Sequence, residues 1–114
     1  MSPTAERIFE ILNGQDFMST ETLARGLGLA SARSLRGKDG EAGLLRASGD
    51  EIFREKGLVL IRRMEAPSGV KLSDDPKEVS DAARQWMSFG TQILDQARDY
   101  DKKAMMLGST QLTL

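Results

Sequence analysis

Residues 25–38, with the sequence RGLGLASARSLRGK, contain four cations and no carboxylate, although the whole chain has a net charge of −1. A cationic segment without acids can contact the phosphate backbone of a nucleic acid, and one of its arginines can bond to a guanine edge. Serines at the start of a helix can add hydrogen bonds to phosphate. The candidate contacts of this basic segment are Arg25, Ser31, Arg33, Ser34, Arg36 and Lys38. The alternative is a solvated face where like charges gather by chance, since 29% of the residues are charged.

Three further cations flank a predicted turn: Arg62 and Arg63 precede it and Lys71 follows it, with Glu65 as the one acid between them. Cations at such a turn can lie along phosphates. Adjacent strand residues point to opposite faces of a sheet, so the two arginines cannot both contact DNA from a regular strand. The alternative is an edge strand that its cations protect against aggregation.

The residue types argue against an enzyme or a metal site. The chain has no histidine and no cysteine, which removes the commonest general base, the commonest metal ligand and any disulfide. Paired acids occur at Asp74–Asp75 and Asp99–Asp101, but close neighbours on a helix do not face each other, and the first pair is better explained as a helix cap. No glycine-rich phosphate loop is present. We therefore expect no catalytic residue, no metal and no cofactor.

The N-terminal elements follow from caps and apolar spacing. Ser2-Pro3 starts a helix that ends at Asn13-Gly14, and Ser19 or Thr20 caps a second helix. A GLGL turn and a third segment capped by Ser31 complete the outline of a helix-turn-helix. The segment GLLRASGDEIFREKG predicts one or two short helical turns, with Gly57 as the C-cap, that bury Leu44, Leu45, Ile52 and Phe53. LVLIRRM and VKLS predict a two-stranded hairpin around the turn EAPSG.

The C-terminal segment SDDPKE is a strong helix start, and no proline follows it before about Leu107. Such a helix would be ~45 Å long, too long for one small domain to cover. It therefore predicts a homodimer, with a frayed tail over residues 108–114. The alternative is a break near Gly90, with two shorter helices folding back as a monomer. The predicted dimer seam recurs at steps of three and four and consists of Val79, Ala82, Trp86, Phe89, Ile93, Ala97 and Tyr100.

The size and composition fit a small domain: 114 residues, of which 39% are hydrophobic. No run of eighteen apolar residues occurs, so we expect no membrane association. The N-terminus lacks the basic-then-apolar pattern of a signal peptide. These features predict a cytoplasmic protein, in the bacterial cytoplasm or nucleoid.

The order of helix, link, helix, turn, helix and hairpin resembles that of a winged helix-turn-helix. TETLARGLGL looks like the first two elements of that motif, and GLVLIRRMEAPSGVKLSDDPKE looks like its wing with an exit into a helix. GVKLSDDPKEV is also similar to the wing exit of small phage and prophage winged-helix proteins. The resemblance implies a mainly α fold with a small β-hairpin (α+β). Residues 1–73 would form the winged helix-turn-helix and residues 74–107 a long C-terminal helix.

The resemblance implies sequence-directed binding of double-stranded DNA, as a phage- or plasmid-borne regulator of transcription or replication. The sequence departs from it at RGKDGEAG, where three glycines stand in the expected recognition helix. Either that helix is very short, about residues 32–37, or a loop is inserted. The alternative function is a protein–protein module, such as an inhibitor of a host complex, because a net charge of −1 is low for a DNA-binding protein.

Overall fold

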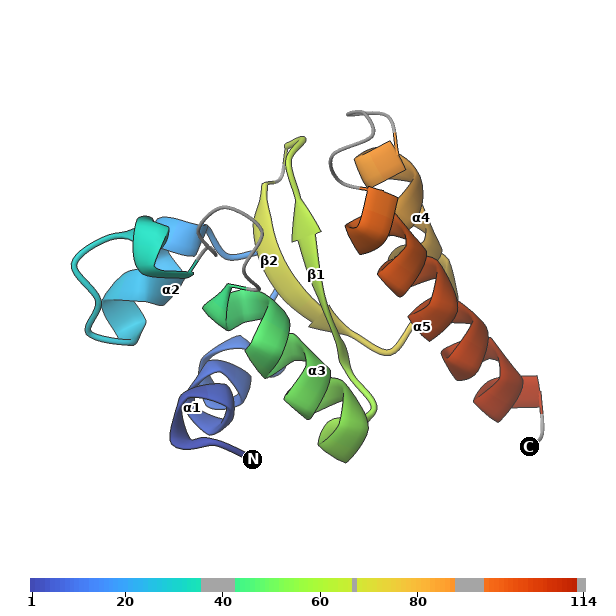
Figure 1. Ribbon diagram of the computed structural model, residues 1–114, viewed down its shortest axis with the longest axis horizontal. Coiled ribbons are helices and arrows are strands. Elements are labelled where there is room, and N and C mark those ends of the chain that lie inside the picture. Colours follow the sequence, from blue (N-terminus) through green and yellow to red (C-terminus); the bar gives the residue numbers. More distant parts are fainter. Residues whose placement is uncertain (36–42, 67, 88–93, 113–114) are drawn as a thin grey trace. The chain divides into compact units, whose positions relative to one another are not determined.

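The computed structural model describes residues 1–35, 43–66, 68–87 and 94–112. The chain forms two compact units, Met1–Leu72 and Ser73–Leu114. The described residues form five α-helices, one 3-10 turn and a two-stranded sheet (Figure 1), so the chain is mainly helical with a small β-hairpin, as predicted. No described helix is both long enough and apolar enough to cross a membrane.

The first helix, α1 (Pro3–Leu12), starts as its sequence predicts. The Ser2 hydroxyl accepts a hydrogen bond from the Ala5 N–H at 3.2 Å, and Pro3 occupies the first turn, where its missing N–H has no helical partner to lose. Ala5, Ile8 and Leu12 are buried on one face of the helix. This face contributes to the core of the first unit.

The second helix, α2 (Thr20–Gly26), is capped by Ser19, whose hydroxyl accepts from the Thr22 N–H at 3.1 Å. Its C-terminal turn closes when the Leu29 N–H donates to the Ala24 carbonyl at 2.9 Å. Gly28 has φ +74°, a conformation that favours glycine. The chain then forms a single 3-10 turn, η1 (Ala32–Leu35), which packs against α2.

The segment before the hairpin forms one continuous helix, α3 (Leu44–Lys56), and not the one or two short turns expected. Its buried face consists of Leu45, Ser48, Gly49 and Ile52, which follow helical spacing. Two of these four are small, because α3 packs closely on the first strand: a Cβ at Gly49 would lie 3.3 Å from the Leu60 Cβ. Leu44 and Phe53 are half-buried, whereas Leu45 and Ile52 are buried as predicted.

The hairpin consists of β1 (Val59–Arg63) and β2 (Gly69–Ser73). On the other edge of β2, Met18 and Val70 exchange two backbone hydrogen bonds of 2.9 and 2.8 Å. The strand β2 therefore lies between β1 and Met18. This junction requires glycine at position 69, where φ is +130° and a Cβ would lie 2.1 Å from the Met18 carbonyl oxygen.

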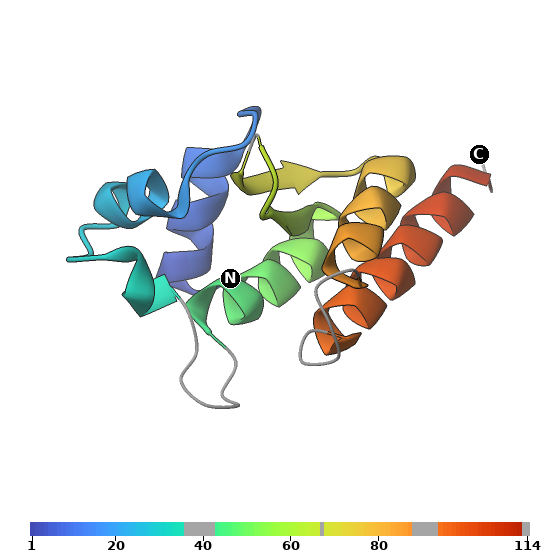
Figure 2. The ribbon, with the colours of Figure 1, turned by 90° about the horizontal axis from the view of Figure 1, so that it is seen from above.

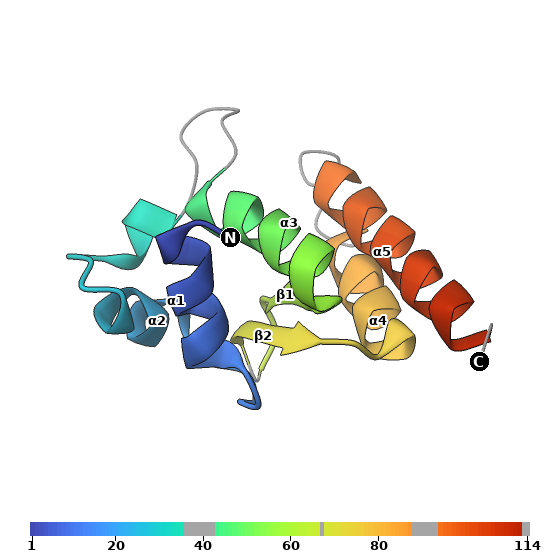
Figure 3. The ribbon, with the colours of Figure 1, turned by 90° about the horizontal axis from the view of Figure 1, so that it is seen from below.

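The core of the first unit lies between its helices and one face of the sheet. The helices α1 and α3 lie side by side (Figure 3), and α3 also packs on β1. The core residues come from all of these elements, although they are far apart in the sequence. They are Ala5, Ile8, Leu12, Leu23, Ala24, Leu35, Leu45, Ile52, Leu60, Val70 and Leu72.

The second unit contains α4 (Pro76–Met87) and α5 (Leu94–Leu112), which pack against each other along their length (Figure 2). The prediction of one straight helix over Pro76 to Leu107 is therefore wrong, since the two halves of one straight helix cannot touch. The fold-back that was the alternative describes the unit, although Gly90 itself lies outside the described residues. Asp75 caps α4 as expected, accepting from the Lys77 N–H at 3.0 Å.

The apolar stripe that predicted a dimer seam is buried within one chain. Val79 and Ala97 are fully buried, Tyr100 is 1% exposed and Trp86 is 6% exposed. One chain buries these side chains without a second copy, which removes the reason for expecting a dimer. Ala82 is half-buried, and Phe89 and Ile93 lie outside the described residues.

Candidate nucleic-acid interface

Three side chains meet on one face of the sheet in the first unit: Phe17, Arg63 and Lys71. Because Met18 pairs with Val70 in antiparallel fashion, Phe17 stands opposite Lys71. The guanidinium carbon of Arg63 and the Nζ of Lys71 each lie 5.7 Å from the centre of the Phe17 ring. Both cations are within the range at which the negative face of an aromatic ring attracts them. We call these three residues the Phe17 cluster.

Arg63 is held by this ring and not by an acid. Among the described residues, no carboxylate forms an ion pair with it, and its buried Nε has no hydrogen-bond acceptor. An unpaired buried donor costs about 1–3 kcal/mol. The fold thus keeps the positive charge of Arg63 without neutralising it.

Asp16 is an acid beside Lys71. The Oδ1 of Asp16 lies 3.9 Å from the Lys71 Nζ and accepts a hydrogen bond from the Phe17 N–H at 2.8 Å. The Asp16 side chain is 85% exposed. The Asp16 carboxylate therefore lies beside Lys71, at the solvent edge of the Phe17 cluster.

Arg62 does not belong to the Phe17 cluster. Strand alternation places it on the opposite face from Arg63, together with the core residue Leu60. The side chain of Arg62 is half-buried there. Of the three wing cations, the structure brings together Arg63 and Lys71.

The basic segment is described only in part. Arg25, in the last turn of α2, and Arg33 and Ser34, in η1, are exposed, whereas Ser31 is half-buried. Arg36 and Lys38 lie outside the described residues. The expected recognition helix over residues 32–37 is, over its described part, the single turn η1, since the helix that precedes the hairpin is α3.

The outward side of α3 was missed from the sequence. Arg46, Asp50 and Arg54 recur every four residues and are exposed, so they lie in a row along the helix. The four-residue spacing of these charges could have revealed the row. It was missed because Gly49 and Ser48, on the buried face, weaken the helical pattern of the segment. Two arginines of this row are available to solvent on the helix that leads into the hairpin.

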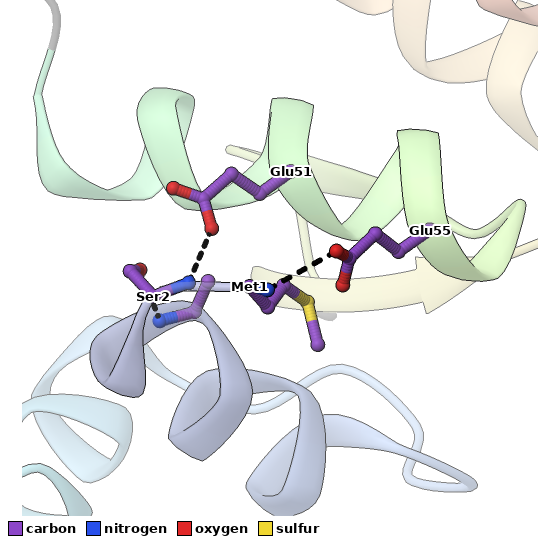
Figure 4. Close-up of polar contacts among 5 residues, drawn as sticks. Met1, Ser2, Glu51 and Glu55 are labelled. Carbon is purple, nitrogen blue, oxygen red and sulfur yellow. Dashed lines mark hydrogen bonds and ion pairs between the residues drawn. The ribbon is translucent and has the colours of Figure 1, made fainter.

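Two acids of α3 are engaged by the start of the chain (Figure 4). The Met1 amino group pairs with the Glu55 Oε1 at 3.1 Å, and the Ser2 N–H donates to the Glu51 Oε2 at 2.7 Å. On the same helix, the Nζ of Lys56 lies 5.1 Å from the centre of the Phe9 ring of α1. These contacts tie α3 to the N-terminal segment and to α1, and they orient Glu51 and Glu55 toward the start of the chain.

The net charge of the first unit is small. Residues 1–72 contain eleven Lys and Arg against ten Asp and Glu, and residues 73–114 contain five against seven. A surplus of one positive charge attracts DNA only weakly over long range. Binding to phosphate would depend on where the cations lie and not on the total charge.

Comparison of the chain with known protein families, with curated proteins and with solved structures found no match. Within the described ranges, no three acids are grouped so that they could hold a metal ion. The arrangement of the first unit is compatible with a winged helix: the helix α1, a strand contact at Met18, the helices α2 and α3, and a hairpin follow in that order.

Proposed function

We propose that this protein binds double-stranded DNA through the unit Met1–Leu72, in the manner of a winged helix, and that it is a phage- or plasmid-borne regulator of transcription or replication. The observation that carries the proposal is the Phe17 cluster, which gathers Arg63 and Lys71 on one sheet face. Cations on one face of the unit can bind oxygens of a phosphate backbone. A side chain that is already oriented loses less entropy on binding.

The other contacts follow from the surface of the same unit. Arg46 and Arg54, on the exposed row of α3, are the proposed contacts to base edges, because α3 is the helix that leads into the hairpin. Arg25, Arg33 and Ser34 are proposed to contact phosphates, with Ser31, Arg36 and Lys38 as further candidates in the basic segment. Arg62 is proposed as a weaker contact, because strand alternation places it on the other face of the hairpin from Arg63.

A gel-shift titration of duplex DNA at low and high salt tests the proposal. The expected result is a shift that weakens steeply with salt, because bound phosphates release their counterions. Arg63→Ala and Lys71→Ala should each reduce the salt slope by about one unit. The matched control is Arg84→Ala, which removes an exposed cation of α4. No shift by the wild-type chain at low salt would refute DNA binding.

The second candidate function is a protein–protein module, such as an inhibitor of a host complex. Two observations favour it: the first unit carries a net charge of only +1, and α3 has three acids as well as three cations. Co-purification distinguishes the candidates. Recovery of one host protein in fixed ratio, with no nucleic acid, would support the module.

A homodimer remains a separate proposal. A dimer through Trp86 and Tyr100 would require these side chains to leave their buried positions, since both are buried within one chain. While they stay buried, we expect a 12.5 kDa monomer in sedimentation at micromolar concentration. A dimer that Trp86→Ala dissociates would show that the seam joins two chains.

A further inference from the structure

The single asparagine of the sequence, Asn13, is followed directly by Gly14 at the end of α1. Both residues are exposed. We infer that this pair is a site of spontaneous covalent modification, at which Asn13 loses its side-chain amide and becomes aspartate or isoaspartate. The reaction involves no residue of the proposed DNA interface, so it does not depend on the proposed function.

The reaction is an attack of the main chain on a neighbouring side chain. The Gly14 nitrogen loses its proton to a base in the solvent and bonds to Cγ of Asn13, while the Cγ–Nδ2 bond breaks and ammonia leaves. Water then opens the five-membered imide at one of its two carbonyl carbons. Opening at Cγ gives aspartate, and opening at the main-chain carbonyl leaves Gly14 bonded to Cγ, which is isoaspartate. One water is consumed and one ammonia released, and the attack is intramolecular.

The attacking nitrogen is available. The Asn13 N–H still donates to the Phe9 carbonyl at 2.9 Å, as in a helix. The next backbone donor in this turn is Gln15, whose N–H reaches the Leu12 carbonyl at 3.0 Å. Between them, the Gly14 N–H has no acceptor among the residues that the structure describes. Inside a helix, the same nitrogen would be held by a hydrogen bond to the preceding turn.

The surroundings leave room for the imide ring. Asn13 has φ −61° and ψ 123°, which is extended backbone, so ring closure needs a rotation about its Cα–C bond and not the loss of a helical turn. No atom lies within 4 Å of the position that a Cβ of Gly14 would take. Because glycine has no side chain, it does not crowd its own nitrogen during the attack.

The product changes the end of α1. It places a carboxylate at the C-terminal end of a helix whose last turn has no basic residue, where the helix dipole disfavours negative charge. Isoaspartate also lengthens the main chain by one methylene between α1, which contributes to the core, and Met18, which is paired with Val70. The modified chain should therefore melt about 1–8 °C below the fresh chain.

Mass spectrometry of the folded full chain during incubation tests the inference. The peptide that contains Asn13 should gain the mass difference between OH and NH₂, and faster at mildly alkaline than at neutral pH, because the attacking nitrogen must lose its proton. Asn13→Gln is the matched control, since it keeps an amide but would need a six-membered ring. It should stay unmodified over the same time.

A synthetic peptide of residues 8–18 gives the rate of the same reaction without the fold. We expect the folded chain to react within about tenfold of this rate, because no hydrogen bond of the Gly14 N–H has to open first. A folded chain that stays unmodified while the peptide reacts would overturn the inference.

Two further readings distinguish Asn13 from other sources of damage. An isoaspartyl methyltransferase with its methyl donor labels isoaspartate and not aspartate, and Asn13→Gln gives the background from aspartate residues. Label and loss of melting temperature should both increase with incubation in the wild type and stay at background in Asn13→Gln. Equal increases in the two proteins would overturn the assignment to Asn13.

Discussion

Gly69 is the residue with the least freedom to change. Its φ of +130° is strained for any side chain, and a Cβ would lie 2.1 Å from the Met18 carbonyl oxygen, which is backbone and cannot turn aside. We expect Gly69→Ala to lower the free energy of unfolding by about 3 kcal/mol or more, measured by urea denaturation. The control is Gly108→Ala in α5, where no atom lies within 4 Å. The free energy of unfolding of that variant should rise by about 0.5–1 kcal/mol.

Phe17 orients the two cations of its cluster, so its ring should affect DNA binding without touching DNA. Phe17→Leu keeps an apolar side chain and loses the ring quadrupole, and two cation–π contacts of about 0.5–1 kcal/mol each would be lost. We expect about threefold to tenfold weaker binding in a fluorescence anisotropy titration. Phe17→Tyr should bind as the wild type does. Equal affinities for all three proteins would show that the ring has no positioning role.

The sequence could name the cations of the cluster but not the ring that joins them. Arg63 and Lys71 stood out by charge, and strand alternation separates Arg62 from Arg63. Phe17 is uncharged and belongs to none of the motifs found in the sequence. Its place opposite Lys71 depends on the pairing of Met18 with Val70, a long-range contact that no local pattern encodes.

At the scale of elements, α3 carries the charges that the proposal assigns to base contacts. We expect Arg46→Ala and Arg54→Ala to weaken binding and to reduce the preference between DNA sequences, because base contacts determine specificity. Arg7→Ala is the control, since Arg7 is exposed on α1 and pairs with Glu10. Competition titrations with two unrelated duplexes measure the preference. Equal weakening of the binding to both duplexes would show that these arginines contact phosphates and not base edges.

The starts of three helices could be predicted from the sequence, whereas the continuous helix α3 and the division of the C-terminal segment into two helices could not. Caps at Ser2, Ser19 and Asp75 follow from local chemistry, and all three are present. The apolar spacing of the C-terminal segment is the same whether its stripe faces a second copy or its own second half. Spacing alone therefore cannot distinguish a dimer from a fold-back within one chain. The continuous α3 was missed because Gly49 weakens a helical pattern, although close packing on β1 requires it.

Trp86 should contribute to the stability of the second unit and not to that of the first. It is 6% exposed in α4, and removing a buried tryptophan side chain costs about 3–5 kcal/mol. We expect Trp86→Ala to lose helical signal from α4 and α5 in a ¹H–¹⁵N spectrum, while signals of Met1–Leu72 keep their dispersion. Met87→Ala is the control, because Met87 is exposed on the same helix. Loss of dispersion throughout the chain would show that the two units unfold together.

For the whole molecule, the division after Leu72 predicts that the first unit folds by itself. Its core cluster is drawn entirely from residues before Ser73. A fragment of residues 1–72 should therefore show cooperative thermal unfolding and keep the salt-dependent binding of the full chain. A non-cooperative fragment would mean that residues 73–114 are needed for the fold.

The bridge between Met18 and Val70 also determines when the first unit can be completed. Its two partners are 52 residues apart, whereas α4 and α5 are joined by the short segment 88–93. Contacts between distant residues form late, since the loop between them must first close. At a synthesis rate of about 5–20 residues per second, Met18 waits roughly 3–10 s for its partner. During translation, the N-terminal edge of the sheet therefore stays unpaired until β2 has been synthesised.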